Sequence, residues 1–334
     1  MRLFFVTLLL GTNLLLSVSL CEIQAQDRFR SPDRFRAQDR LQEPDVPRVQ
    51  QPLQVPMPPE FVELQKLCEA GRWDDGKTIA TRLVANNPQQ PWTHFWLGYV
   101  ELRRHDAMAA IRSLRKSQVL GLREPTVAKT LGLAYYSIHQ FTLFQEQMKK
   151  AIQDAPRDAW PHYYLGLYEV NVTENFELAS KYLSQALSLG ADDAKIHYYH
   201  GYCAEIRGDS QLARQDYETA IRLLARSGLV FSLPYQRLAI LLAETEPALA
   251  LQNAQMAVAM EPKLASNHVT LAKLLENEGK LAEAIEKLKM AVRLDLTLAS
   301  PYYRLHRLYL KLGERDAAAK AMDSFQTLAK LYGS

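Results

Sequence analysis

The sequence has little of what several common classes of protein require. Its 334 residues include three cysteines, Cys21, Cys68 and Cys203, which lie far apart and in no paired spacing. A small exported domain held together by disulfides would need more of them. The fold must therefore depend on its hydrophobic core. The formal net charge is only +3, which gives no electrostatic argument for binding nucleic acid.

Motifs of known catalytic chemistry are also missing. The sequence contains no nucleophile elbow, no H-E-x-x-H zinc motif, no paired cysteine ligands and no glycine-rich dinucleotide loop. We therefore expect a protein that is not an enzyme, with no cofactor and no bound metal.

One segment, Gly71–Thr78, matches the phosphate-binding pattern G-x-x-x-x-G-K-[ST]. That loop works only between a β-strand and a helix, where backbone N–H groups converge on the phosphate. Residues 60–70 read as a helix, and Asp74 and Asp75 would repel phosphate. We interpret the match as coincidental, and nucleotide binding at this segment is the least favoured of the alternative functions.

A long apolar run occurs only at the N-terminus. Arg2 is followed by an uncharged, leucine-rich stretch to Leu20. This pattern is typical of a secretory signal peptide, here residues 1–25, with cleavage near Cys21 or Ala25. An uncleaved membrane anchor is the alternative, because the run is close to the length that spans a bilayer. We expect an exported protein, periplasmic or otherwise extracytoplasmic, whose only route to a membrane is an uncleaved N-terminus.

Residues 26–57 are expected to form a disordered tether. Seven of the 16 prolines in the chain lie between Pro32 and Pro59, and the charges in this segment are mixed. Its apolar content is too low to offset the entropy of ordering the chain. The segment therefore links the cleavage site or membrane to a folded body.

The folded body, residues 58–330, is built from internal repeats. A small residue follows an aromatic or leucine-rich turn at Gly98, Gly132, Gly166 and Gly201, at intervals of 34, 34 and 35 residues. The same position is filled later by Ala239, Ala272 and His306. A turn and a second amphipathic stretch follow each of these segments. The small residue lets two helices approach closely, and hairpins that cannot bury their own apolar faces stack on one another.

This pattern resembles the tetratricopeptide repeat (TPR) family over about residues 58–330. Eight units can be counted, beginning near residues 57, 91, 125, 159, 194, 231, 265 and 299. The fourth unit has one extra residue near Val172, and the unit at 231 has Pro247 in its turn. The resemblance implies an all-α fold, a right-handed α-solenoid of about eight helical hairpins.

Histidine recurs at one position of four different units: His94, His162, His197 and His268. Equivalent helices of successive repeats are separated by about 8–10 Å or more, whereas zinc requires nitrogens at about 2.0–2.1 Å from the ion. Histidines one repeat apart therefore cannot share a metal. We expect them to be packing residues.

The resemblance also implies a partner-binding groove, because in this family particular faces of the first helices line the concave surface. The residues at those places are Trp92, Phe95, Tyr99, Lys129, Trp160, Tyr163, Tyr198, Tyr202, Lys273, Tyr303 and Arg307. The alternative is that some of these aromatic side chains are buried between repeats. The Lys/Asn clamp with which some family members hold a terminal carboxylate is not reproduced.

We therefore expect an exported TPR scaffold or adaptor that binds a protein or peptide partner in an aromatic groove and supports assembly of an extracytoplasmic complex. The aromatic N-terminal half of the groove suits apolar anchors. Toward the C-terminal end, Lys273, Arg304, Arg307 and Lys311 favour acidic groups. Recognition of a cell-envelope glycan by the same groove is the alternative.

Overall fold

The computed structural model of the chain describes residues 59–332, and the predicted signal peptide and tether lie outside this range. The described residues form helices and no strands. They divide into two compact units, of which residues 59–263 and 264–332 are described. Within these residues, no helix is both long enough and apolar enough to cross a membrane.

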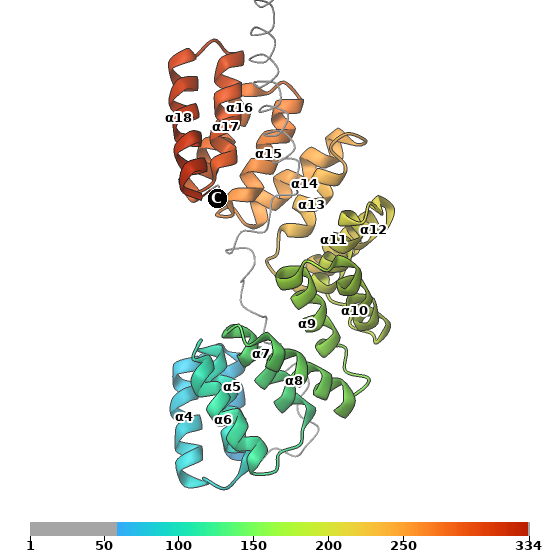
Figure 1. The fold of residues 1–334 in the computed structure, drawn as a ribbon, viewed down its shortest axis with the longest axis vertical. Helices are drawn as coiled ribbons and strands as arrows, with labels where there is room; N and C mark the ends of the chain where they lie inside the picture. Colours follow the sequence, from blue (N-terminus) through green and yellow to red (C-terminus); the bar gives the residue numbers. More distant parts are fainter. Residues whose placement is uncertain (1–58, 333–334) are drawn as a thin grey trace, which may run out of the picture. The chain divides into compact units, whose positions relative to one another are not determined.

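The first unit consists of six consecutive helical hairpins, each packed against the next (Figure 1). The helices pair as α3 (Pro59–Glu69) with α4 (Trp73–Asn86), α5 (Pro91–Arg103) with α6 (Ala107–Val119), α7 (Pro125–Ser137) with α8 (Phe141–Asp154), α9 (Trp160–Tyr168) with α10 (Phe176–Ser188), α11 (Ala194–Ile206) with α12 (Ser210–Ser227), and α13 (Leu233–Leu241) with α14 (Pro247–Met260).

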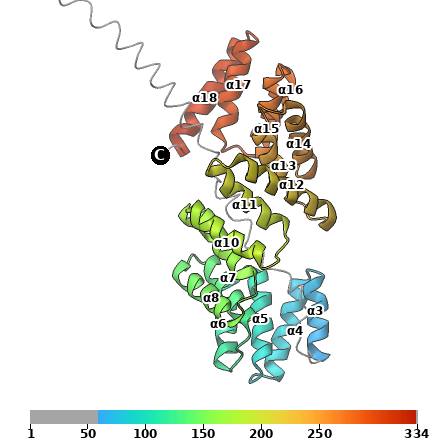
Figure 2. The ribbon, with the colours of Figure 1, turned by 90° about the vertical axis from the view of Figure 1, so that its right-hand side faces the viewer.

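The second unit consists of two hairpins built in the same way, and Figure 2 shows them in orange to red. They are α15 (Ala265–Asn277) with α16 (Leu281–Leu294), and α17 (Ala299–Lys311) with α18 (Arg315–Tyr332). The eight first helices begin within two residues of the starts that the repeat predicts. The predicted all-α solenoid of about eight helical hairpins is confirmed.

Local sequence signals set the helix ends. Proline occupies one of the first two positions of α5, α7, α9, α13 and α14, where the missing N–H costs nothing. Several second helices begin at a side chain that accepts a hydrogen bond from a free backbone N–H of the first turn. Asp106 accepts from Ala109 N at 3.0 Å, and Asn175 accepts from Leu178 N at 3.1 Å.

Close approach of the two helices in a hairpin explains the small residue of the repeat. A Cβ atom added at Gly166 would lie 2.7 Å from Leu183 Cγ, and one added at Gly132 would lie 2.5 Å from Met148 Cε. The second helices also carry small buried residues, such as Ala220 and Ala291, which are fully buried. These helix pairs reach a separation that larger side chains would prevent.

The extra residue of the fourth unit is absorbed by a π-helical turn. After α9, the chain continues as η1 (Glu169–Thr173), a π-helix that ends at Glu174 in the left-handed conformation with φ of 55°. A π-turn accommodates one additional residue within a helix without breaking it. The first helix of this hairpin therefore keeps its packing despite the insertion.

Candidate partner-binding face

The segment Gly71–Thr78 is not a phosphate-binding loop. A helix, α3, precedes it instead of a strand, and its residues from Trp73 onward form the first turns of α4. The acidic side chains are engaged in ion pairs, Asp75 with Arg72 at 2.7 Å and Asp74 with Arg104 at 2.7 Å. The strand–loop–helix arrangement that nucleotide binding by this motif requires is therefore absent at this segment.

The four repeated histidines do not converge. His94 Nε2 lies 2.9 Å from the carbonyl oxygen of Pro88, the His162 ring is tilted against the Tyr182 ring with centroids 6.3 Å apart, and His268 is buried. The structure places no group of three or more His, Cys, Asp or Glu side chains with metal-binding geometry among residues 59–332. The predicted packing role agrees with these positions.

The polar cluster around Asp216 has a triad-like order of hydrogen bonds. Asp216 Oδ2 lies 2.7 Å from His200 Nδ1, and His200 Nε2 lies 2.9 Å from Ser184 Oγ. His197 Nδ1 lies 2.9 Å from the other carboxylate oxygen of Asp216, Oδ1. Ser184 lies in the middle of α10, where backbone N–H groups are bonded within the helix, so they cannot form an oxyanion hole. The cluster serves as a hydrogen-bonded link between α10, α11 and α12.

The two described cysteines are unsuited to nucleophilic chemistry. Cys68 and Cys203 are free thiols, and Cys203 is fully buried. Burial raises the pKa of each thiol to about 12. Both are therefore protonated at neutral pH, when only a thiolate would react.

Most aromatic side chains predicted to line the groove are buried instead. The exposed fraction is 0% for Phe95 and Tyr198, 2% for Tyr163, 4% for Tyr99 and 5% for Tyr202. Their rings contact one another and neighbouring helices. Tyr198, for example, meets Phe231 edge-on, with centroids 5.1 Å apart. The expectation that these five are exposed anchors is wrong, because aromatic rings on the first helices fill the space between repeats.

Two tryptophans and one lysine of the predicted set remain partly accessible in the first unit. Trp92 and Trp160 are half-buried and each packs edge-on against a buried ring. Lys129 Nζ lies 2.5 Å from Asp158 Oδ2, so its charge is already paired. In this unit, the tryptophans are the predicted anchors that a partner could still reach.

An ion pair that the sequence reasoning missed joins two first helices of this unit. Arg237 on α13 donates to both carboxylate oxygens of Glu205 on α11, and Tyr217 Oη donates to the same carboxylate at 2.6 Å. The Arg237 guanidinium also lies over the Tyr202 ring, 5.2 Å from its centroid. Burial alone would lower the pKa of Arg237, but the Glu205 charge raises it. The pair therefore links the first helices of two neighbouring repeats, α11 and α13.

The first helices of the second unit carry a different arrangement, which we call the cation cluster: Arg304, Arg307 and Lys311 around Glu276. The three cations lie at i, i+3 and i+7 on α17 and so share one face of that helix. The Glu276 carboxylate comes from α15, one repeat earlier. Lys273 lies one turn before Glu276 and is exposed.

The three residues of this unit that were predicted to line the groove differ in how exposed they are. Lys273 and Arg307 are exposed, and Tyr303 is half-buried with its ring 5.3 Å from that of Phe325. Glu276 was missed by the sequence reasoning. Its signal was its spacing, 28 and 35 residues before Arg304 and Lys311, which is about one repeat.

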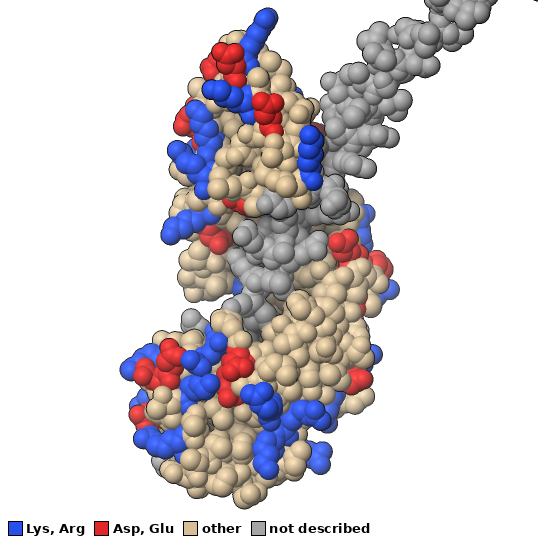
Figure 3. All heavy atoms as spheres, turned by 60° about the vertical axis from the view of Figure 1, so that its left-hand side comes forward, with Lys and Arg blue, Asp and Glu red and all other residues tan. Residues whose placement is uncertain are grey.

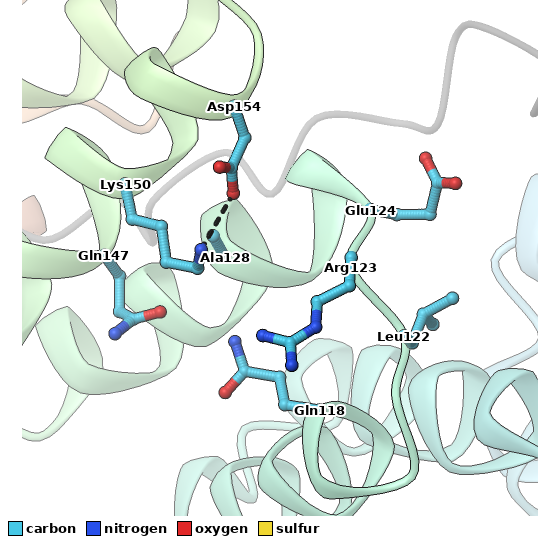
Figure 4. Close-up of a pocket in the computed structure, with 8 residues that line it drawn as sticks. All are labelled: Gln118, Leu122, Arg123, Glu124, Ala128, Gln147, Lys150 and Asp154. Carbon is cyan, nitrogen blue, oxygen red and sulfur yellow. Dashed lines mark ion pairs between the residues drawn. The ribbon is translucent and has the colours of Figure 1, made fainter.

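One small pocket lies away from these faces, between the end of α6, the start of α7 and α8. It has a volume of about 180 Å³. Figure 4 shows the Arg123 guanidinium and the Gln118 amide extending toward each other, beside the ion pair of Lys150 with Asp154. The charges that line it balance, because Glu124 and Asp154 oppose Arg123 and Lys150. The two positive and two negative side chains give the lining no net charge that would favour a charged ligand.

Over much of the face drawn in Figure 3, charges of both signs lie close together. Lys and Arg also gather in one patch on the lower part of that face. Local clusters, such as the cation cluster, therefore determine where charged partners could bind.

The fold and the repeated hairpin define a class of helical repeat protein. A tetratricopeptide repeat family model matches residues 173–227, and no curated protein matches the chain. Together with the hairpin array, this match supports a tetratricopeptide repeat protein.

Solved structures share the fold at low identity. The chain resembles a chain of the APC/C hetero-tetramer Cut9–Hcn1, with a TM-score of 0.63 and 16% identity, covering 78% of this chain and 48% of that one. It also resembles PilW, a type IV pilus biogenesis factor, with a TM-score of 0.54 and 16% identity over 62% of this chain and 94% of PilW. The chain also resembles the C-terminal part of a TPR repeat-containing protein from Cytophaga hutchinsonii, with a TM-score of 0.51 and 15% identity, covering 72% of this chain and 97% of that one. The chain thus spans about half of the first of these structures, and the likeness shows the fold.

Proposed function

We propose that this chain is an exported scaffold that binds a protein or peptide partner on the exposed faces of its first helices, and that it supports assembly of an extracytoplasmic complex. One observation carries the proposal. The first helices of residues 264–332 present exposed cations, Lys273 on α15 and Arg307 and Lys311 on α17, and no group of His, Cys, Asp or Glu able to hold a metal lies among the described residues. Arginine and tryptophan are the residue types that most often dominate binding energy at protein interfaces.

The tryptophans of the first unit supply a second kind of contact. Trp92 and Trp160 are half-buried, so each ring is held by packing while part of it stays accessible. Rings held in this way lose little side-chain entropy when a partner covers them. We propose that they act as apolar anchors on the first unit.

Recognition of a cell-envelope glycan fits the face less well. That alternative required a broad aromatic surface, and five of the predicted rings are buried. A protein or peptide remains the favoured partner class.

Capture of the partner by the mature full-length protein, with identification by mass spectrometry, tests the proposal. Trp92→Ala, Trp160→Ala and Arg307→Glu are expected to reduce capture of the same partner. Lys320→Glu is the charge-matched control, because Lys320 is exposed on the second helix α18 and has no acidic partner among the described residues. If the three first-helix variants capture the partner as the wild type and the control do, the first-helix faces are not the binding surface.

Export rests on Arg2 and the apolar run to Leu20. N-terminal sequencing of protein from the native host is expected to begin shortly after Cys21 or Ala25. An intact N-terminus on protein in the membrane would support the anchor instead, and one on protein in the cytosol would contradict export.

A further inference from the structure

The cation cluster holds its own carboxylate at its base. Glu276 Oε1 lies 3.0 Å from Lys311 Nζ and 3.8 Å from Arg307 Nη2, and Glu276 Oε2 lies 3.5 Å from Arg304 Nη1. The Glu276 side chain is 11% exposed, while those of Arg307 and Lys311 are 48% and 47% exposed. The carboxylate therefore lies at the bottom, and the cations form the accessible rim.

The charges of this cluster do not balance. Three cations face one carboxylate, and Lys273, on the same helix as Glu276, has no acidic partner among the described residues. The neighbouring acid Glu278 is engaged elsewhere, with Lys280 at 2.8 Å. The face therefore keeps a local excess of positive charge.

The cations also keep unused hydrogen-bond donors. A guanidinium group carries five N–H donors, and the distance from Arg307 to Glu276 is too long for a hydrogen bond. Arg304 and Arg307 can therefore donate hydrogen bonds to a further carboxylate. A guanidinium group can bind a carboxylate through two parallel hydrogen bonds, which the lysine ammonium group cannot do.

We infer that the cation cluster binds an acidic peptide segment of the partner, with at least two neighbouring carboxylates, and that Glu276 is a resident carboxylate that competes with it. This inference rests on the proposed function, since it names the partner's chemistry at one of the proposed faces. The contacts with Glu276 show that these three cations are placed to bind a carboxylate. A carboxylate of the bound peptide would share the three cations with Glu276. The negative charge of Glu276 would also repel it and so weaken binding.

An acidic peptide fits this face better than nucleic acid. The excess charge is confined to four side chains on two helices, and the whole chain carries a net charge of only +3. A duplex presents one phosphate charge for about every 1.7 Å of its axis and is held by a more extended set of cations. The small cluster matches two or three carboxylates on a short segment.

Fluorescence anisotropy with a labelled glutamate-rich peptide and its glutamine-substituted counterpart tests the inference on the mature full-length protein. The wild type is expected to bind the acidic peptide, and the affinity is expected to fall as salt is added. Glu276→Gln keeps the side-chain volume and removes the competing charge. It is expected to tighten binding about tenfold, which corresponds to about 1.4 kcal/mol.

Two further variants complete the experiment. Arg307→Gln, at an exposed position that is expected to fold normally, is expected to lose most of the affinity for the acidic peptide. Lys320→Gln on α18 removes a cation from a second helix and is expected to leave the affinity unchanged. Circular dichroism on each variant checks that the helices are intact.

Each outcome decides a different point. Weaker peptide binding by folded Glu276→Gln would mean that Glu276 positions the cations, and competition would be refuted. Equal binding of the acidic and glutamine peptides, or tighter binding of a DNA oligonucleotide or of anionic vesicles, would overturn the acidic-peptide inference. In those cases the scaffold proposal survives if partner capture still depends on Trp92 or Trp160, and it fails only if capture is insensitive to all first-helix variants.

Discussion

The contact between the two helices of a hairpin can be tested by adding one methyl group at three glycines. Alanine in a helix interior is favoured over glycine by about 0.5–1 kcal/mol. At Gly76 in α4, an added Cβ would meet its nearest atom, Leu64 Cδ1, at 3.6 Å, which is ordinary van der Waals contact. Gly76→Ala is therefore expected to stabilise the chain by about 0.5–1 kcal/mol.

Gly166→Ala is expected to have the opposite effect. Its Cβ would lie 2.7 Å from Leu183 Cγ and 2.9 Å from Leu183 Cδ2. The branch point of a fully buried leucine must then move, and overpacking of this kind costs about 1–3 kcal/mol. After subtracting the helix-propensity gain, the net loss is expected to be about 1 kcal/mol.

Gly132→Ala is the matched intermediate. Its nearest contact, at 2.5 Å, is Met148 Cε, the flexible end of a side chain that can swing aside. Gln147 Cβ at 3.2 Å must yield only slightly. Gain and cost are expected to cancel to within about 1 kcal/mol.

Urea unfolding followed by far-UV circular dichroism measures all three variants against the wild type. The expected order of stability is Gly76→Ala, then wild type and Gly132→Ala, then Gly166→Ala. If Gly166→Ala is as stable as the wild type, or Gly76→Ala is less stable than Gly166→Ala, the close approach described for these hairpins is incorrect.

The buried aromatic residues and the histidine cluster give two further predictions. Tyr198→Ala should lower the free energy of unfolding by about 3–5 kcal/mol, because a fully buried ring is removed. Trp92→Ala, at a half-buried site, should cost less, and equal urea midpoints for the two would argue against the burial of Tyr198. Burial alone would lower the pKa of His197, but hydrogen bonds and charges from Asp216 and Asp192 raise it above 6.5. A raised pKa in the fold means that the stabilisation is complete below about pH 6.5 and is lost as the pH rises through the folded-state pKa. Thermal melts should therefore show a decline in stability above pH 6.5 that His197→Gln reduces, and an unchanged pH profile in that variant would exclude His197 as its source.

Much of this fold could be predicted because it is encoded locally. The 34-residue spacing of small residues, the prolines in first turns and the amphipathic second stretches each specify part of a hairpin, so the helix starts follow from the sequence to within two residues. The extra residue of the fourth unit was also visible. That this residue is accommodated by the π-turn Glu169–Thr173 was shown only by the structure, because the spacing does not specify where the helix widens.

The binding face could be predicted only in part. Repeat position places Phe95, Tyr163 and Tyr198 on the first helices, but burial depends on how far the next hairpin covers that face. An amphipathic period cannot distinguish a ring that lines a groove from one that fills the gap between two repeats. Lys273 and Arg307 are exposed as predicted, because charged side chains are rarely buried without partners.

The sequence by itself determined the hairpin array and the cations on α17, since each depends on residues close together in the chain. Only the tertiary structure decided which charges are engaged. Glu205 meets Arg237, and Glu276 meets Arg304 and Lys311, across one repeat. The physical reason is that an ion pair depends on distances of a few ångströms between side chains on different helices. Those distances are fixed by the packing of whole hairpins, which no local pattern specifies.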